Sequence, residues 1–145
     1  MLFRSGRARL IVENDDRTFS LQDALEVHRR TGVRVVWDIL HHHCNDPEGI
    51  PDREALELAL ATWPEGVRPK IHYSSPRTAV EERKGRLVLP PLRAHADMVD
   101  PIGFEHFVTE TAAGLDLDVM LEAKGKDLAL LRLREQLAAR GVVSA

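Results

Sequence analysis

The sequence is short of cysteine, of aromatic residues and of long apolar runs. Cys44 is the only cysteine among 145 residues, so no disulfide can form within the chain, and we expect the reducing cytoplasm as its location. No apolar run approaches the roughly 20 residues that a membrane-spanning helix needs. The first ten residues also lack the apolar segment of a secretory signal peptide. The sequence therefore argues against a disulfide-rich secreted domain and against a membrane partner.

A strong charge of either sign is also missing. The formal net charge is −3, with 43% hydrophobic and 30% charged residues, which is ordinary for a globular protein. Broad nucleic-acid binding usually needs a basic surface. A metal site weakens that objection, because each divalent ion adds two positive charges where carboxylates gather. The length suffices for one domain with its own core, so we expect a single domain over residues 1–145.

What the sequence does contain is an alternation of short apolar runs with stretches of helical spacing. The runs at 8–15, 33–40, 67–75 and 115–125 predict strands, and those at 20–32, 52–63, 102–114 and 126–141 predict helices. Ser20 and Asp52 are expected N-caps, and Gly32 and Gly141 are expected helix ends. The remaining stretch, 76–101, is expected to be a long connection.

This order predicts an α/β fold in which helices cover a parallel sheet. Because eight such units take roughly 250 residues in a (β/α)8 barrel, four units indicate half of a TIM barrel. A small, open, doubly wound sheet is the competing interpretation.

Chemically active side chains fall at the carboxyl ends of the predicted strands. Glu13, Asp38, His72 and Glu122 occupy four successive strand ends, which is where sites form in parallel α/β folds. One such residue alone is typical of an ordinary surface position. Three carboxylates and one imidazole together are a ligand set for a divalent ion, and we expect the four to converge on one.

Two histidine positions extend this set. His41, His42 and His43 follow Asp38 closely, but consecutive side chains diverge, so all three cannot point at one site. We expect His41 to be the ligand, with His42 or His43 supporting it by a hydrogen bond. His95 is the other loop histidine expected at this face.

Lys70 shares a strand face with His72, because side chains alternate along a strand. An ammonium beside metal ions is electrostatically unfavourable. Lys70 could therefore pair with a carboxylate, act neutral or carry a carbamate. A lysine that binds phosphate is the remaining alternative.

The sequence resembles the UV damage endonucleases in five ordered segments. These are VENDDRTF (12–19), WDILHHH (37–43), KIHYSS (70–75), AHAD (94–97) and DVMLEAKGKDLALLRLR (118–134). That family comprises DNA-repair enzymes with a TIM-barrel fold similar to endonuclease IV, and the resemblance covers only its carboxyl-terminal half. The resemblance implies nicking of damaged double-stranded DNA 5′ of UV photoproducts and abasic sites.

The resemblance also implies roles for individual residues. Up to three divalent ions are expected in the complete barrel, commonly manganese, with zinc or magnesium as alternatives. Glu13 matches a bridging glutamate, and Asp38, His72 and Glu122 match the ligands that share one ion with it. His41 and His95 match ligands of a further ion. Lys70 matches a carboxylated lysine, which makes Glu13, Lys70 and Glu122 the expected catalytic residues.

Two other functions remain open at this point. A sugar isomerase of the xylose-isomerase type also places Glu, Asp, His and Glu at successive strand ends, but it has no evident use for Lys70, His41 and His95. An inactive half-barrel that binds metal without turnover is the third hypothesis. Half a barrel would leave sheet edges open, so a missing amino-terminal half, a second copy or another chain is expected to complete it.

Overall fold

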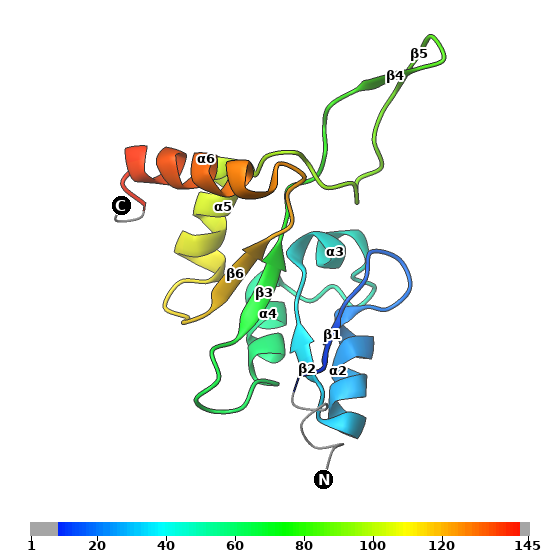
Figure 1. Ribbon diagram of the computed structural model, residues 1–145. Coiled ribbons are helices and arrows are strands. Elements are labelled where there is room, and N and C mark those ends of the chain that lie inside the picture. The colour runs from blue at the N-terminus through cyan, green and yellow to red at the C-terminus, as the bar shows by residue number, and fades with distance from the viewer. Residues whose placement is uncertain (1–8, 143–145) are drawn as a thin grey trace. The chain divides into compact units, whose positions relative to one another are not determined.

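The computed structural model describes residues 9–142 of the chain (Figure 1). The chain divides into two compact units. The first comprises the chain up to His72 together with 114–120, and the second comprises 73–113 and the chain from Leu121 onward. Each unit is described by itself below. A single domain over residues 1–145 stays a prediction.

The fold is α/β, as predicted. The strands are β1 (Ile11–Glu13), β2 (Arg34–Val36), β3 (Lys70–Tyr73), β4 (Glu81–Arg83), β5 (Arg86–Val88) and β6 (Asp118–Leu121). The helices are α2 (Leu21–Thr31), α3 (Ile39–Cys44), α4 (Asp52–Leu60), α5 (Pro101–His106), the π-helix η1 (Phe107–Thr111) and α6 (Lys126–Ala139). In the described part of the chain, the strands form three two-stranded sheets, β1–β2, β3–β6 and β4–β5, and no barrel.

Parallel pairing in the first unit aligns the carboxyl ends of its strands. Strand β1 pairs with β2 in parallel, with Glu13 opposite Val36. Two residues further on, Asp38 forms a parallel bridge with His72. Helix α2 packs against β1 and β2, and α4 packs against β2. This packing buries an apolar core that includes Val35, Val36, Trp37, Ala55, Leu56 and Ile71.

The predicted ends of helix α2 are confirmed. The N–H of Ser20 donates to the Asp23 carboxylate (2.9 Å), and Gly32 follows the helix with a positive φ of 69°, a conformation that favours glycine. The predicted cap of α4 is wrong by one residue. Pro51 is the N-cap and Asp52 is already helical. The Asp52 carboxylate accepts a hydrogen bond from His43 (2.9 Å) and does not cap the helix.

The predicted strand 33–40 is too long. Strand β2 ends at Val36, and the short helix α3 begins at Ile39 with Asp38 as its N-cap. The Asp38 side chain accepts a hydrogen bond from the N–H of His41 (2.9 Å). Such a side-chain cap offers the backbone a helical alternative to the strand, and this changes the direction in which His41 points.

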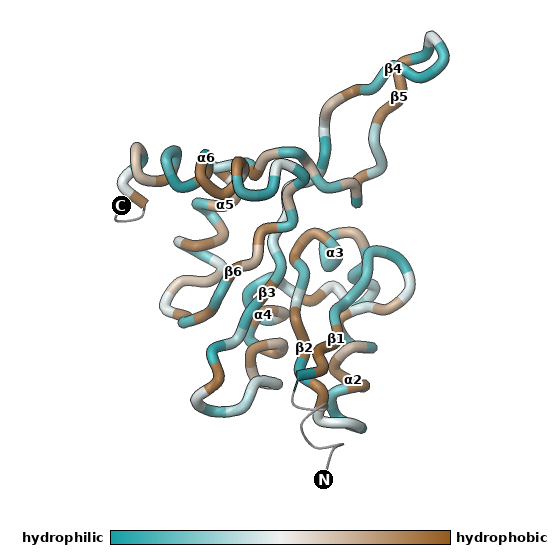
Figure 2. Tube along the Cα trace, in the orientation of Figure 1, coloured by the Kyte–Doolittle hydropathy of each residue, from teal (hydrophilic) through white to brown (hydrophobic). Residues whose placement is uncertain are grey.

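The second unit contains an aromatic cluster and a hairpin. Tyr73 contacts Phe104 and Phe107 with ring centroids 4.9 and 5.2 Å apart, and α5 packs against α6. The stretch predicted as a plain connection contains the antiparallel strands β4 and β5. No helix in the described residues is long and apolar enough to cross a membrane. Apolar and polar segments alternate along most of the trace (Figure 2).

Candidate metal centre

Three of the predicted ligands meet in the first unit. Glu13 ends β1, Asp38 follows β2, and His72 lies in β3. Each offers one ligand atom, and these atoms lie within 4.8 Å of one another. Glu13 Oε1 is 3.1 Å from His72 Nδ1. Two carboxylates and an imidazole at this spacing fit a divalent ion.

Asp38 is the most deeply buried of these residues, with a side chain that is 0% exposed. A buried carboxylate is costly unless hydrogen bonds or a cation offset its desolvation. One part of the offset is the helix cap that Asp38 gives to α3. The buried carboxylate of Asp38 lies beside a second carboxylate, that of the partly exposed Glu13. Two neighbouring carboxylates favour a cation at this position.

His41 joins the cluster because α3 begins where it does. His41 Nδ1 lies 3.3 Å from Glu13 Oε1 and 4.0 Å from Asp38 Oδ2. The same nitrogen lies 3.0 Å from the backbone oxygen of Asn14, so the Nδ1–H donates to that carbonyl. Nε2 is therefore the ring nitrogen that would bind a metal ion, once the ion displaces the proton on it.

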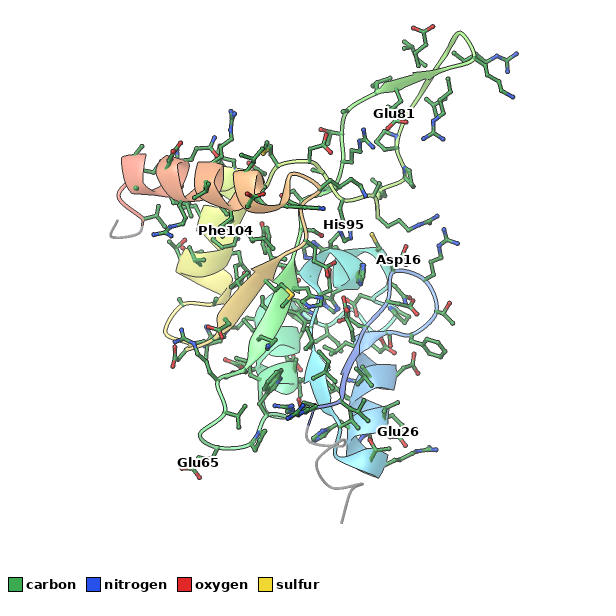
Figure 3. All side chains as sticks on the ribbon, in the orientation of Figure 1. Asp16, Glu26, Glu65, Glu81, His95 and Phe104 are labelled. Atoms are coloured by element: carbon green, nitrogen blue, oxygen red, sulfur yellow. The ribbon has the colours of Figure 1, made fainter. Side chains whose placement is uncertain are left out.

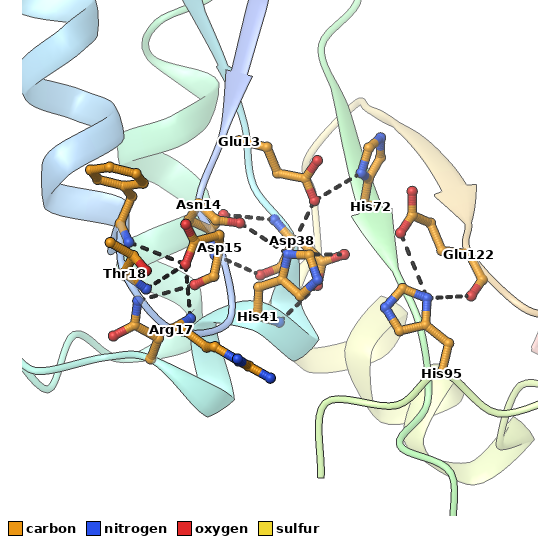
Figure 4. Close-up of polar contacts among 12 residues, drawn as sticks. Glu13, Asn14, Asp15, Arg17, Thr18, Asp38, His41, His72, His95 and Glu122 are labelled. Carbon is orange, nitrogen blue, oxygen red and sulfur yellow. Dashed lines mark hydrogen bonds and ion pairs between the residues drawn. The ribbon is translucent and has the colours of Figure 1, made fainter. Parts of the chain in front are cut away.

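The contacts of Glu13 with His41 and His72 favour positive charge in this cluster (Figure 4). Burial alone would raise the pKa of Glu13, but hydrogen bonds from His41 and His72 lower it to about 2. The hydrogen bond with Glu13 raises the pKa of His41 to about 9, against the opposing effect of burial. The carboxylates thus hold a proton on His41 at neutral pH. A metal ion could supply the same positive charge.

His42 and His43 do not support this cluster as predicted. His42 is buried, and its Nε2–H donates to the carbonyl of Ile50 (2.8 Å). His43 is exposed and pairs with Asp52 (2.9 Å). The three consecutive histidines therefore point to three different places, and His41 is the one that faces Glu13.

Lys70 lies two residues before His72 in β3 and is half-buried. Alternation along the strand puts both side chains on one face, as predicted. The expected carbamate on Lys70 stays a prediction.

In the second unit, His95 and Glu122 lie together. His95 Nδ1–H donates to the backbone oxygen of Glu122 (2.9 Å), and the same nitrogen is 3.7 Å from the Glu122 carboxylate. Figure 3 labels His95 among the side chains. The shared ion that the sequence predicts for Glu122 and the residues of the first unit stays a prediction.

Asn14 is a residue of this centre that the sequence analysis missed. It is fully buried, and its side-chain amide donates to the backbone oxygen of Asp38 (3.0 Å) and accepts from the Asp38 N–H (2.9 Å). No signal in the sequence singled it out, because Asn14 stands inside a run of polar residues, 13–17.

Comparisons with known proteins identify the family of the chain. Residues 1–144 match the family described as UV-endonuclease UvdE. The chain belongs to the UV-endonuclease family. A UV DNA damage endonuclease of Bacillus pumilus (strain SAFR-032) is 37% identical over 135 residues, which are 92% of this chain and 39% of the relative. One of Bacillus velezensis is 34% identical over 143 residues, covering 94% of this chain and 40% of the relative.

A solved structure of this family is also similar. It is titled "Crystal Structure of SacUVDE", with a TM-score of 0.72 and 33% sequence identity, and the match covers 93% of this chain and 41% of that one. The chain thus spans about two fifths of the length of the UV endonucleases it matches. The family match favours the repair endonuclease over the sugar isomerase among the sequence hypotheses.

Proposed function

We propose that this chain supplies the metal-binding face of a DNA-repair endonuclease that acts on UV-damaged double-stranded DNA. In this proposal it corresponds to the carboxyl-terminal half of a TIM barrel. The reaction is hydrolysis of the phosphodiester backbone 5′ of UV photoproducts and abasic sites. The remaining half of the barrel comes from an amino-terminal segment, a second copy or another chain.

One observation carries this proposal. The ligand atoms of Glu13, Asp38 and His72 lie within 4.8 Å of one another at the carboxyl ends of adjacent strands, in a chain that belongs to the UV-endonuclease family. Support for the half-barrel comes from the coverage of the relatives, which the chain matches over 39% and 40% of their length.

We assign Glu13, Asp38, His72 and Glu122 to one divalent ion, and His41 and His95 to a further one. Glu122 follows β6, and its N–H donates to the carbonyl of Tyr73 (2.9 Å), the residue next to His72 in the chain. That hydrogen bond supports the assignment of Glu122. Manganese is the proposed metal, with zinc or magnesium as alternatives, and the complete barrel would hold up to three ions.

The chemistry divides between the metal and the side chains. A bound divalent ion would supply a Lewis acid for the attacking water and the leaving oxygen of the phosphodiester. Glu13 stays ionised at neutral pH, because its pKa is about 2, and it holds negative charge at the centre. His41 and His95 each donate an Nδ1–H to a backbone oxygen, which orients the ring with Nε2 as the nitrogen that would bind the ion. Lys70, if carboxylated, would add a further anionic oxygen beside His72.

Nicking of UV-irradiated supercoiled plasmid tests the proposal. The chain is assayed with Mn²⁺, alone and together with the part of the Bacillus pumilus relative that it does not cover. We expect the combination to nick irradiated plasmid in preference to untreated plasmid. Substitution of Glu13→Gln or Asp38→Asn should abolish that nicking.

The matched control is Glu54→Gln, an exposed carboxylate on α4 of the same unit. This variant should nick at the parental rate. Equal nicking by the parental chain and the Glu13→Gln and Asp38→Asn variants would refute the assigned centre. Persistent inactivity of the combination, with metal bound, would favour the inactive half-barrel.

A further inference from the structure

The stretch after β3 contains a paired β-hairpin, β4–β5, with a defined turn. Its strands pair with Glu81 opposite Val88, Glu82 opposite Leu87 and Arg83 opposite Arg86. The two connecting residues, Lys84 and Gly85, both have positive φ, 53° and 72°. Positive φ at both positions is the type I′ geometry, whose twist matches that of paired strands. The ribbon extends away from α5 and α6 of its own unit (Figure 1).

Large apolar side chains are exposed on this ribbon and at its base. Leu87 lies on β5 opposite Glu82, and Val80 and Leu89 directly precede β4 and follow β5. The exposed fractions of Val80, Leu87 and Leu89 are 51%, 80% and 74%. Figure 2 shows these apolar segments flanking a polar turn. An isolated two-stranded hairpin is at best marginally stable in water. Exposed leucines of this kind mark a surface that contacts a partner.

The tip of the ribbon is basic. Arg83, Lys84 and Arg86 fall within the four residues of the turn. Glu81, at the opposite end of β4, is neutralised by Arg77 and by Arg83, each 2.7 Å away, and the hydrogen bond from Arg83 lowers the pKa of Glu81. The basic tip stands out in a chain whose net charge is −3.

We propose that hairpin β4–β5 is an arm that grips duplex DNA, with Lys84 and Arg86 on phosphates and Leu87 against the bases of a groove. The proposal rests on the proposed endonuclease function. A two-stranded ribbon fits the major groove of DNA, and other DNA-binding proteins press leucine side chains between base steps in the minor groove. Basic side chains beside such an apolar residue complement the phosphate backbone.

Salt-dependent binding to undamaged duplex tests the arm separately from nicking. Binding is measured by fluorescence anisotropy in the presence of EDTA, with the chain and the part of the Bacillus pumilus relative that it lacks. Each phosphate contact contributes about 0.9 to the slope of log affinity against log salt. The double variant Lys84→Asn/Arg86→Gln should therefore reduce the slope by about two. Asparagine keeps the turn, because Asn-Gly is a preferred type I′ pair.

The matched control is Arg132→Gln/Arg134→Gln on α6, which removes two exposed charges from the same unit. This control should keep the parental slope. Leu87→Ser should lower the affinity without changing the slope, because it removes an apolar contact and no charge. An unchanged slope in the Lys84/Arg86 variant would overturn the proposal. The proposal would also be overturned if Leu87→Ser kept the parental DNA affinity and only formed a smaller assembly in solution, because Leu87 would then contact protein.

The metal-free design separates the two proposals. If the parental combination does not nick irradiated plasmid but its salt slope still falls in the Lys84→Asn/Arg86→Gln variant, the endonuclease proposal is refuted and the DNA-binding hairpin is not. Nicking that persists with a parental slope in the hairpin variant would refute the arm alone.

Discussion

The side-chain amide of Asn14 is hydrogen-bonded to both backbone groups of Asp38. It donates to the Asp38 carbonyl (3.0 Å) and accepts from the Asp38 N–H (2.9 Å). The backbone oxygen of Asn14 also accepts the Nδ1–H of His41 (3.0 Å). Asn14 thus fixes the backbone of one candidate ligand and the ring of another, and it directly follows a third, Glu13.

Asn14→Ala should weaken metal binding as well as stability. The substitution leaves two buried backbone groups of Asp38 without their partner, at about 1–3 kcal/mol each. We expect the Mn²⁺ affinity to fall by about 10- to 100-fold, the usual effect of removing a group that orients a ligand. Equilibrium dialysis against Mn²⁺ and urea unfolding measure the two effects.

Asn45→Ala is the control for this prediction. Asn45 makes a comparable hydrogen bond to the carbonyl of Asp15 (3.1 Å) in the same unit. This variant should lose some stability and keep the parental Mn²⁺ affinity. A parental affinity in Asn14→Ala would show that Asn14 is only structural.

Asp38→Asn should stabilise the metal-free protein while it removes the stabilisation by metal. Asparagine caps a helix as well as aspartate does, so the bond to the His41 N–H survives, and the cost of a buried charge disappears. We expect a higher Tm in EDTA and no rise in Tm on adding Mn²⁺. Asp46→Asn, a half-buried position nearby, should keep the Mn²⁺-dependent rise. A parental rise in Asp38→Asn would exclude Asp38 as a ligand.

The α/β class and the strand-end positions of the ligands could be predicted from the sequence, because they follow from residue periodicity. Glu13 ends β1, Asp38 follows β2 and His72 lies one residue before the end of β3, in strands that the apolar runs already indicated. The helix α3 could not be predicted in the same way. It depends on a side-chain cap at Asp38, whereas the apolar run continues through Leu40 as a strand would.

The hairpin β4–β5 and the role of Asn14 were missed for a related reason. Lys84 adopts a positive φ, which is uncommon for lysine, so only the glycine that follows it indicated a turn. Asn14 acts through contacts with residue 38, 24 positions away. Contacts at that separation depend on strand pairing, which periodicity alone does not give.

Carboxylation of Lys70 predicts a carbamate signal that depends on bicarbonate. A carbamate replaces a positive charge by a negative one beside His72, which a metal centre would stabilise. Protein equilibrated with ¹³C-bicarbonate and Mg²⁺, which avoids paramagnetic broadening, should show one carbamate carbon resonance by NMR. Lys70→Arg should lose the resonance and lower the metal affinity, whereas Lys124→Arg on the exposed loop after β6 should keep both. A resonance that survives in Lys70→Arg would refute the assignment.

The ion pair of Glu13 and His41 predicts how the stability of the metal-free protein depends on pH. The pKa of His41 rises from 6.5 to about 9 in the folded chain, so its contribution is complete below pH 6.5 and is lost as the pH rises towards 9. The pKa of Glu13 falls from 4.5 to about 2. Its contribution is complete above pH 4.5 and is lost as the pH falls towards 2.

Urea unfolding in EDTA should therefore show greatest stability between pH 4.5 and 6.5 from this pair. His41→Gln should flatten the alkaline limb, and His106→Gln, an exposed histidine on α5, should leave it unchanged. Metal binding at pH 7 must also displace the His41 proton. Calorimetry in buffers of different ionisation enthalpy should then show close to one proton released by the parental protein and less by His41→Gln. Equal proton release by both proteins would mean that His41 does not bind the metal.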